Sequence, residues 1–435
     1  MGSASQDTYT LPPATSPSLG LAHPTDAEKR RTWALNHTHW GGALTLEQYL
    51  KREAYFTTIP LTRDGGMTHW ILTDSAWSPA AATDSSTRPV LASCESIRKR
   101  VLVAYSNPDP GADSTTAAAA TVHERVGHGI GSVFTYPEFR GNRYAARMLS
   151  DLGPWLRKWQ AQDGRDAACS ALWSDIGKQY YAKKGWAAFP SLHAEFLVPV
   201  PVSVSVDGKE SGREEQEEEE ESERGKGEGE GEITPISYDN LEPLCQRDEQ
   251  LLKERLLRTA RATRRTSAAF APDHDTLRWH LYRDDYISSV LFKTAAPFAR
   301  GAIAGPEGRR VWAVWARSYG GIGAPADNVH KNKLYILRLV IEPEASEEMK
   351  EVPSNDIQEA FTAVMQAAQR ESSRWHLGKV DLWNPSTIVK KLIDQSGLQH
   401  RWVERDEDSI PSMMWYGDED VRNVEWVANE KYCWC

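Results

Sequence analysis

Residues 133–149, VFTYPEFRGNRYAARML, decide the fold of this chain. An apolar strand stops at Pro137, and a turn through Arg140 and Gly141 leads into a helix. The apolar residues of that helix recur at the spacing of one helical face: Ala145, Met148, Leu149 and Leu152. The first turn of such a helix carries unbonded backbone N–H groups at the positive end of the helix dipole. This arrangement predicts a pyrophosphate site, which the small residues Gly141 and Ala145 would let a ligand approach closely.

Strand and helix patterns alternate on both sides of this stretch. Strands are predicted at 67–73, 89–93, 100–105, within 122–136, at 171–173 and near 187–189. Helices are predicted at 44–50 and from the end of the strand 171–173 to residue 184. The second half of the chain has a similar order. Its predicted strands are 311–317, 334–342, 380–383 and 424–427, and its helices are 357–375 and 386–395. We therefore expect an α+β (α/β layered) protein with two lobes, each a mixed sheet flanked by helices. The second lobe is either a degenerate repeat of the first or an unrelated α+β lobe.

An acidic run suggests where the lobes divide. The run from 209 to 232 holds twelve Glu and four Lys or Arg, so eight of the ten net negative charges of the chain lie there. Such a segment buries too little apolar surface to offset its chain entropy. We expect a disordered N-terminus at 1–25, a first domain at 26–203, a disordered acidic linker at 204–234 and a C-terminal lobe at 235–435. Without its linker the chain is nearly neutral, which argues against nucleic acid as a partner.

Composition excludes several other classes. No apolar run is long enough to cross a bilayer, and no secretory signal is evident, so we expect a cytoplasmic protein without a membrane partner. The five cysteines are odd in number and show no zinc-site spacing. We therefore expect reduced thiols and no metal. The sequence gives no indication of the oligomeric state.

The quoted stretch resembles the cofactor motif of the GNAT acetyltransferase superfamily, Q/R-x-x-G-x-G/A, with Arg140 first and Ala145 last. Arg143 departs from the pattern, because it stands where the motif has its first glycine. The resemblance implies a GNAT-type sheet in the first lobe and acetyl-CoA as co-substrate. It assigns cofactor binding to Val133, Phe134, Thr135, Arg140, Gly141, Asn142, Arg143, Tyr144 and Ala145.

A second GNAT element follows at residues 179–186. It is similar to the ending Y-x-x-x-G-F of that superfamily, with Gly185 as the glycine and Trp186 in place of Phe. The tyrosine four residues before the glycine often protonates the departing CoA thiolate, and here this is Tyr181. The alternative is that Tyr181 only packs between helix and sheet.

The wider pattern resembles fungal lysine N-acetyltransferases. The similar stretches are 44–53, 91–95, 132–145, 174–178 with Tyr181, 272–280 and 429–435. The resemblance implies acetyl transfer to the side-chain amine of free L-lysine, forming N6-acetyl-L-lysine in lysine degradation, by direct attack in a ternary complex. Two alternatives remain: a GNAT enzyme for another amine (a polyamine or a protein lysine), and a non-catalytic acyl-CoA-binding scaffold.

Transfer to lysine needs a base, because an amine with a pKa of ~10.4 arrives protonated. Glu95 is one candidate, unless it is a solvated or capping carboxylate. The terminal carboxylate of Cys435 is another, because 430–435 is an apolar, aromatic tail that looks buried; otherwise the last strand simply completes a sheet. The α-carboxylate of lysine needs an arginine partner, for which Arg317 and Arg338 are candidates.

Overall fold

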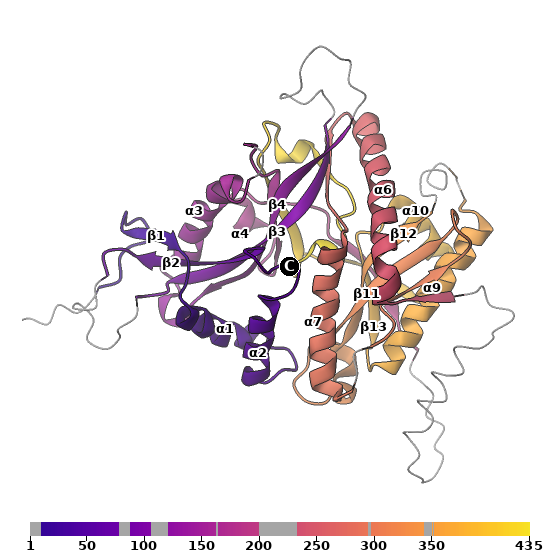
Figure 1. Cartoon of the computed structure of the whole chain (residues 1–435), viewed down its shortest axis with the longest axis horizontal. Helices are drawn as coiled ribbons and strands as arrows, with labels where there is room; N and C mark the ends of the chain where they lie inside the picture. Colours follow the sequence, from indigo (N-terminus) through magenta and orange to yellow (C-terminus); the bar gives the residue numbers. More distant parts are fainter. Residues whose placement is uncertain are drawn as a thin grey trace, which may run out of the picture.

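The computed structural model describes residues 10–77, 88–105, 121–161, 164–199, 233–294, 297–342, 350 and 352–435. Two sheets, each with helices packed against it, lie side by side, and the C-terminal residue lies at the centre of the molecule between them (Figure 1). This confirms the α+β prediction. Residues 204–232 of the expected linker lie outside the described residues.

Within the described ranges, the first sheet has nine strands. Its main path runs β1 (Leu19–Ala22), β2 (Met67–Asp74), β3 (Ala92–Ala104), β4 (Val122–Thr135), β5 (Cys169–Ser174), β15 (Ile410–Trp415) and β6 (Ala187–Ala188). Off this path, β9 (Thr266–Phe270) pairs with β3, and β16 (Val424–Trp426) pairs with β9. The two strands expected at 89–93 and 100–105 are one long strand, β3, because the polar residues between them stay in the ladder with β4.

The second sheet is built from seven strands in the part of the chain that the structure describes. Their order is β14 (His400–Glu404), β7 (Leu192–Leu197), β13 (Lys379–Trp383), β12 (Lys333–Ile341), β11 (Val311–Ser318), β10 (Gly301–Ala304) and β8 (Ile233–Ile236).

The two sheets repeat one plan. Along the main path of each sheet, a series of antiparallel strands ends in a parallel pair, β4–β5 in the first sheet and β12–β13 in the second. A helix joins the members of each parallel pair: α3 (Tyr144–Lys158) and α9 (Asn355–Arg374). The next strand is antiparallel in both cases, β15 beside β5 and β7 beside β13. This common order supports a duplicated GNAT-like lobe.

The lobes exchange strands, which corrects the domain limits expected from the sequence. β7 lies within the expected first domain at 26–203 but pairs in the second sheet, whereas β9, β15 and β16 lie within 235–435 but pair in the first. Two further limits differ. β1 lies within the N-terminal segment expected to be disordered, because it pairs with β2, and β8 takes the last two residues of the expected linker. The acidic run in the sequence indicates a connection between strands, but it does not show which sheet each strand joins.

The remaining helices cover the sheets and the gap between them. They are α1 (Asp26–Trp40), α2 (Leu46–Phe56), α4 (Gln179–Ala182), α6 (Tyr238–Thr263), α7 (His274–Phe292) and α10 (Thr387–Gln395). The predicted start of α2 is confirmed, because Thr45 and Gln48 form a reciprocal capping box. α3 packs on β1 to β5, α9 on β10 to β13, and α7 contacts both α2 and β11.

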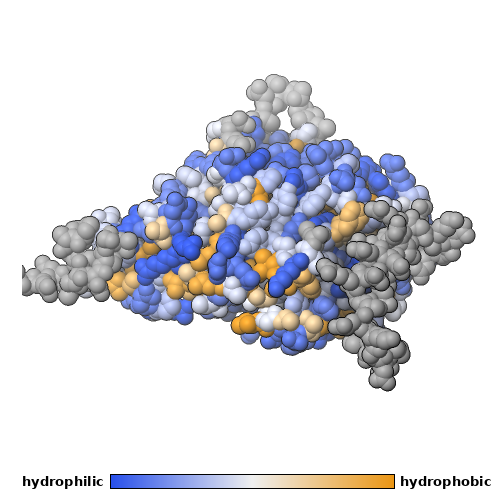
Figure 2. Space-filling view, turned by 60° about the horizontal axis from the view of Figure 1, so that its bottom comes forward, coloured by the Kyte–Doolittle hydropathy of each residue, from blue (hydrophilic) through white to orange (hydrophobic). Residues whose placement is uncertain are grey.

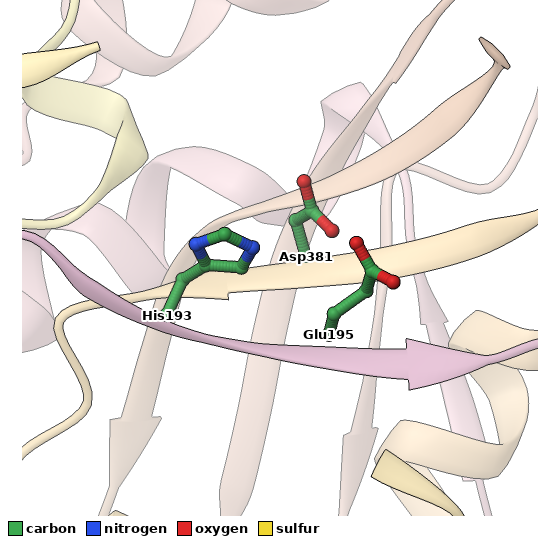
Figure 3. A group of neighbouring side chains, drawn as sticks. All are labelled: His193, Glu195 and Asp381. Carbon is green, nitrogen blue, oxygen red and sulfur yellow. The ribbon is translucent and has the colours of Figure 1, made fainter. Parts of the chain in front are cut away.

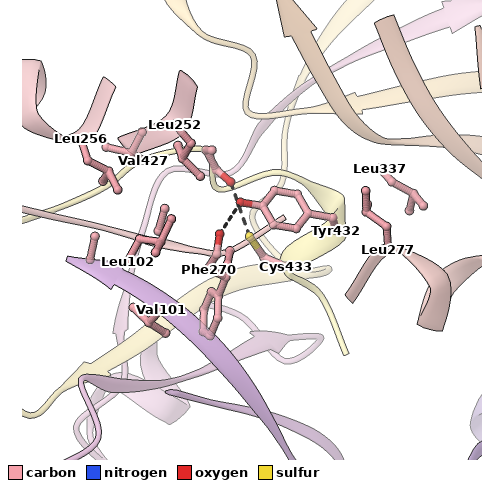
Figure 4. Packing of buried hydrophobic residues seen from close by; sticks show 14 of the residues in the cluster. Val101, Leu102, Leu252, Leu256, Phe270, Leu277, Leu337, Val427, Tyr432 and Cys433 are labelled. Atoms are coloured by element: carbon pink, nitrogen blue, oxygen red, sulfur yellow. Dashed lines mark hydrogen bonds between the residues drawn. The ribbon is translucent and has the colours of Figure 1, made fainter. Parts of the chain in front are cut away.

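The C-terminal tail is part of the main core. The Tyr432 hydroxyl donates to the Phe270 carbonyl oxygen at 2.8 Å, and the Cys433 thiol lies 3.5 Å from the Ala428 carbonyl oxygen (Figure 4). Both side chains pack in one cluster with residues of β3, α6 and α7, which come from both halves of the chain. The tail therefore joins the lobes and fixes the position of Cys435.

The outer surface is mainly hydrophilic in the view of Figure 2, with apolar residues gathered across its lower half. Among the described residues, no helix combines the length and hydrophobicity needed to cross a bilayer.

Candidate active site

Strands β4 and β5 separate near their C-terminal ends. Their parallel pairing stops at Ile130 and Leu172, although β4 continues to Thr135. On its other side, β4 bulges against β3 beside Glu95, and Ser132 takes a left-handed φ of 53°. The separation leaves backbone groups of β4 facing a gap in the sheet, where they are suited to bind a substrate or an oxyanion.

A cavity of about 200 Å³ occupies this gap. Five residues predicted for the site line it: Val133, Thr135, Ala145, Tyr181 and Cys435. They come from β4, α3, α4 and the C-terminal tail, so four distant segments converge there. Asp175, which follows β5, and Trp434 of the C-terminal tail also line the cavity.

The start of α3 faces the cavity through Ala145. No side chain caps the helix, and its N-cap residue Arg143 has left-handed backbone angles, φ 64° and ψ 22°. Gly141 is also left-handed, whereas Arg140 is extended. The side chains of Arg140 and Arg143 are both exposed, so neither fills the helix start. The geometry of this turn therefore fits an anionic ligand such as a diphosphate.

The backbone of Arg143 explains the glycine of the superfamily motif, because glycine adopts positive φ without strain. We expect Arg143→Gly to raise the free energy of unfolding by about 1 kcal/mol, since a non-glycine residue pays 1–2 kcal/mol in this region and glycine offsets part of the gain through its chain entropy. Chemical denaturation measures the change. Arg140→Gly is the matched control and should destabilise slightly, because Arg140 is already extended. Equal effects of both substitutions would contradict this explanation.

Two residues predicted for cofactor binding have side chains in the core instead. Phe134 packs against Tyr136, and the Tyr144 hydroxyl donates to the Pro12 carbonyl oxygen at 2.6 Å. Alternation along β4 turns Phe134 away from the neighbouring cavity residues. Asn142 lies in the turn, where its amide donates to the Phe139 carbonyl oxygen at 3.2 Å. Phe134 and Tyr144 can therefore reach a cofactor only through their backbones, whereas the Asn142 side chain is exposed.

Tyr181 and Cys435 line the cavity, and Glu95 lies behind Gly131 of the cavity wall. Tyr181 is buried, and desolvation raises the pKa of its hydroxyl, so the group keeps its proton at neutral pH. Glu95 and Cys435 flank Gly131: a β-carbon there would lie 3.3 Å from a Glu95 carboxylate oxygen and 3.6 Å from the Cys435 carbonyl carbon. Glycine at this position therefore lets both carboxyl groups approach β4.

Burial also sets the acidity of Glu95. Desolvation raises the pKa of its carboxyl group, although the Ser132 hydroxyl donates to it at 2.9 Å. Glu53 and Arg52 form a buried ion pair nearby, and Glu95 acts electrostatically on Glu53. A raised pKa brings a carboxylate closer to the value at which a general base works near neutral pH.

Lys99 holds the tail in place, which the sequence analysis did not foresee. Its ammonium group donates to the carbonyl oxygens of Cys433 at 2.7 Å and Trp434 at 3.1 Å. His280 adds a contact of 3.0 Å to the Tyr432 carbonyl oxygen. Lys99 stands between Arg98 and Arg100 in the sequence, so the local pattern did not mark it as the buried member of this basic run.

Arg317 and Arg338, the expected partners of a substrate carboxylate, are already paired. Arg317 bonds Asp284 at 2.8 Å and Glu371. Arg338 bonds both oxygens of Asp248 and also Glu430. This corrects the expectation: both arginines point into the protein and stabilise it, and neither can receive a substrate.

His193, Glu195 and Asp381 lie close together on neighbouring strands of the second sheet (Figure 3). Ligand atoms of all three fall within 4.8 Å of one another, as in a metal site. However, Glu195 pairs with Lys379 and Arg401, and Asp381 lies 3.3 Å from the Lys333 ammonium. These cations compensate the carboxylates and would repel a metal ion.

The repeated sheets, the separated strands and the uncapped helix start define a protein of the GNAT class. The chain belongs to the family described as LYC1 GNAT-like C-terminal domain, whose match covers residues 214–435, about half of the chain. Family and fold together support an acyl-CoA-dependent N-acetyltransferase that acts on an amine.

No curated protein matches the chain. Solved structures with a similar arrangement include a probable N-acyltransferase from Enterococcus faecalis (11% identity, 91% of this chain and 71% of that chain, TM-score 0.48). A GCN5-related N-acetyltransferase from Kribbella flavida also matches (13%, 91% and 70%, TM-score 0.43). Saccharomyces cerevisiae N-myristoyltransferase with bound myristoyl-CoA is a third (9%, 96% and 82%, TM-score 0.45). At these scores the matches carry no conclusion about the site.

Proposed function

We propose that the protein transfers the acetyl group of acetyl-CoA to the side-chain amine of L-lysine, releasing N6-acetyl-L-lysine and CoA. The observation that carries the proposal is the cavity where β4 and β5 separate. It places the start of α3, the Tyr181 hydroxyl and the tail residue Cys435 around one space, with Glu95 immediately behind Gly131.

The turn before α3 supplies the binding groups for the co-substrate. The first backbone N–H groups of α3 and the guanidinium groups of Arg140 and Arg143 are suited to the diphosphate of CoA. Backbone groups of β4 from Val133 to Thr135 lie at the open side of the strand, where they can orient the thioester carbonyl and stabilise its developing negative charge.

Proton transfer then falls to the residues around Gly131 and to Tyr181. The lysine ammonium gives up one proton to Glu95, directly or through water, and the neutral nitrogen attacks the thioester carbonyl carbon. A C–N bond forms, the nitrogen loses its second proton to solvent, and the C–S bond breaks as the tetrahedral oxyanion collapses. The Tyr181 hydroxyl gives its proton to the departing thiolate and regains one from solvent. The Cys435 carboxylate is the alternative base on the same side of β4.

Asp175 favours a cationic acceptor at this cavity. Burial, followed by a hydrogen bond with Asp408, raises the pKa of Asp175 to about 6. The carboxyl group is therefore mostly ionised at neutral pH and attracts an ammonium group. This supports an amine substrate and does not by itself select lysine.

The test is CoA-thiol release from acetyl-CoA with a panel of amines: L-lysine, spermidine and a lysine-containing peptide. We expect the highest kcat/KM with free L-lysine, and N6-acetyl-L-lysine as the product by mass spectrometry. Faster turnover of spermidine or of the peptide would reassign the acceptor. Acetyl-CoA binding without release in any reaction would support the scaffold alternative.

A further inference from the structure

Arg405 is a buried cation whose guanidinium group finds no hydrogen-bond acceptor among the described residues. The residue is 7% exposed, and its Nε, Nη1 and Nη2 atoms are all buried and unbonded. The guanidinium group stacks on the Trp383 ring, with its central carbon 4.0 Å from the ring centroid. Stacking orients the group but satisfies none of its N–H donors.

Such an arrangement is costly unless a ligand completes it. Burying an unpaired charge costs several kcal/mol, which is why Arg317 and Arg338 each bond two carboxylates. Among the residues that the structure describes, Arg405 is the arginine whose guanidinium nitrogens are all both buried and unbonded. The planar group has the geometry to bind an incoming carboxylate with two parallel hydrogen bonds.

An unused hydrogen-bond acceptor lies near Arg405, in the cluster formed by His193, Glu195 and Asp381. Asp381 Oδ1 is buried and unbonded, while Oδ2 is the atom that faces Lys333. Asp381 and His193 project from neighbouring strands to the same side of the sheet (Figure 3). The carboxylate of Asp381 acts on Arg405 electrostatically, yet no hydrogen bond joins the two residues. The cluster therefore offers donors for a carboxylate and an acceptor for an ammonium group.

Aromatic contacts connect this cluster to the cavity. The Lys431 ammonium lies 4.3 Å from the Trp383 ring centroid and 3.8 Å from that of Trp434. Trp434 lines the cavity beside Cys435. A chain of contacts therefore runs from Arg405 through the Trp383 ring, Lys431 and the Trp434 ring to the cavity wall.

We propose that Arg405 and Asp381 bind the α-carboxylate and the α-ammonium of an amino-acid substrate whose distal amine points toward the cavity. The inference rests on the proposed acetyl transfer and deepens it, because it explains how a free amino acid is recognised. Holding the head group away from the cavity directs the acetyl group to the side-chain amine and not to the α-amine. Amines without a carboxylate leave Arg405 unpaired and are poorer substrates.

Three ligands separate the two roles. L-lysine carries both charged head groups, 6-aminohexanoate lacks the α-ammonium, and cadaverine (1,5-diaminopentane) lacks the α-carboxylate as well. In thermal-shift measurements on the full chain, we expect L-lysine to stabilise most, 6-aminohexanoate less and cadaverine least. Arg405→Met should abolish stabilisation by the first two, and Asp381→Asn should remove the advantage of L-lysine over 6-aminohexanoate.

Kinetics and stability give independent readouts. Arg405→Met should raise the KM for L-lysine by roughly 10- to 150-fold, the loss of one charge-assisted contact. Its KM for acetyl-CoA and its activity on cadaverine should stay unchanged. The unliganded variant should melt at a higher temperature than the wild type, because the unpaired charge is gone. If Arg405 were purely structural, the unliganded variant would melt at a lower temperature than the wild type. Arg422→Met, at an exposed pair with Asp420, is the control and should change none of these quantities.

Several results would overturn the inference. They are a KM for L-lysine within twofold of the wild type in Arg405→Met, a lower melting temperature of that unliganded variant, and equal stabilisation of the wild type by L-lysine and cadaverine. A different result would contradict the proposed acetyl transfer while leaving the binding site intact. Stabilisation by L-lysine that depends on Arg405, without CoA release, would remove the catalytic claim and support the binding site.

Discussion

Replacing Arg338 with methionine is expected to lower the free energy of unfolding by about 3–5 kcal/mol, the cost of breaking a buried ion pair from one side. Arg338 bonds Asp248 on α6 through two nitrogens and Glu430 in the tail through a third, and all three side chains are nearly inaccessible to solvent. The substitution leaves two carboxylates buried without their cation. Urea denaturation followed by tryptophan fluorescence measures the loss.

Arg309→Met is the matched control. Arg309 also pairs with a carboxylate, that of Asp356, but both side chains are about half exposed. Removing this pair should change stability by at most about 1 kcal/mol. A loss of less than 1 kcal/mol for Arg338→Met would show that the ion-paired cluster does not hold the tail to α6.

Replacing Glu95 with glutamine is expected to lower kcat by roughly 10²- to 10⁴-fold, the usual contribution of a positioned general base. The KM for acetyl-CoA should change little, because Glu95 lies behind β4 and away from the start of α3. Steady-state CoA release measures both constants. Glu124→Gln is the control, since Glu124 bonds Arg100 at an exposed position between the same two strands.

The pH dependence gives a second readout of the same group. Glu95 accepts a proton only when ionised, and burial raises the pKa of its carboxyl group above the ordinary value. Activity of the wild type should therefore fall with decreasing pH at a higher pH than an exposed glutamate would cause. Glu95→Gln should lose this acid limb. A variant with normal kcat would move the base role to Cys435, and one residue added after Cys435 should then reduce turnover.

Local patterns in the sequence predicted the elements that position the site. The apolar spacing after Ala145 defines α3, and the residues of Thr45-Leu-Glu-Gln48 define the start of α2. Both depend on contacts within a few residues. For the same reason the turn at Gly141 could be placed, and the left-handed angle at Arg143 fell where the GNAT motif has glycine.

Contacts between distant segments could not be predicted. No strand was predicted at β7 or β15, and the sheet that each joins depends on partners far along the chain, so their exchange between lobes was missed. The partners of charged residues could not be predicted from the sequence for the same reason. Arg338 lies in an apolar stretch and Arg405 between two acidic residues, yet within the described part of the chain Arg338 bonds two carboxylates and Arg405 bonds none. Only the arrangement of partners in space distinguishes a structural arginine from a candidate binding residue.

The central claim is that the start of α3 binds the diphosphate of acetyl-CoA, and isothermal titration with acetyl-CoA tests it most directly. The wild type should bind, and Ala145→Glu should weaken binding at least tenfold, about 1.4 kcal/mol, because it places a negative charge at the helix start. Ser150→Glu, at an exposed position farther along α3, should bind like the wild type. A wild-type protein that gives no binding signal, or an Ala145→Glu variant with unchanged affinity, would contradict the claim.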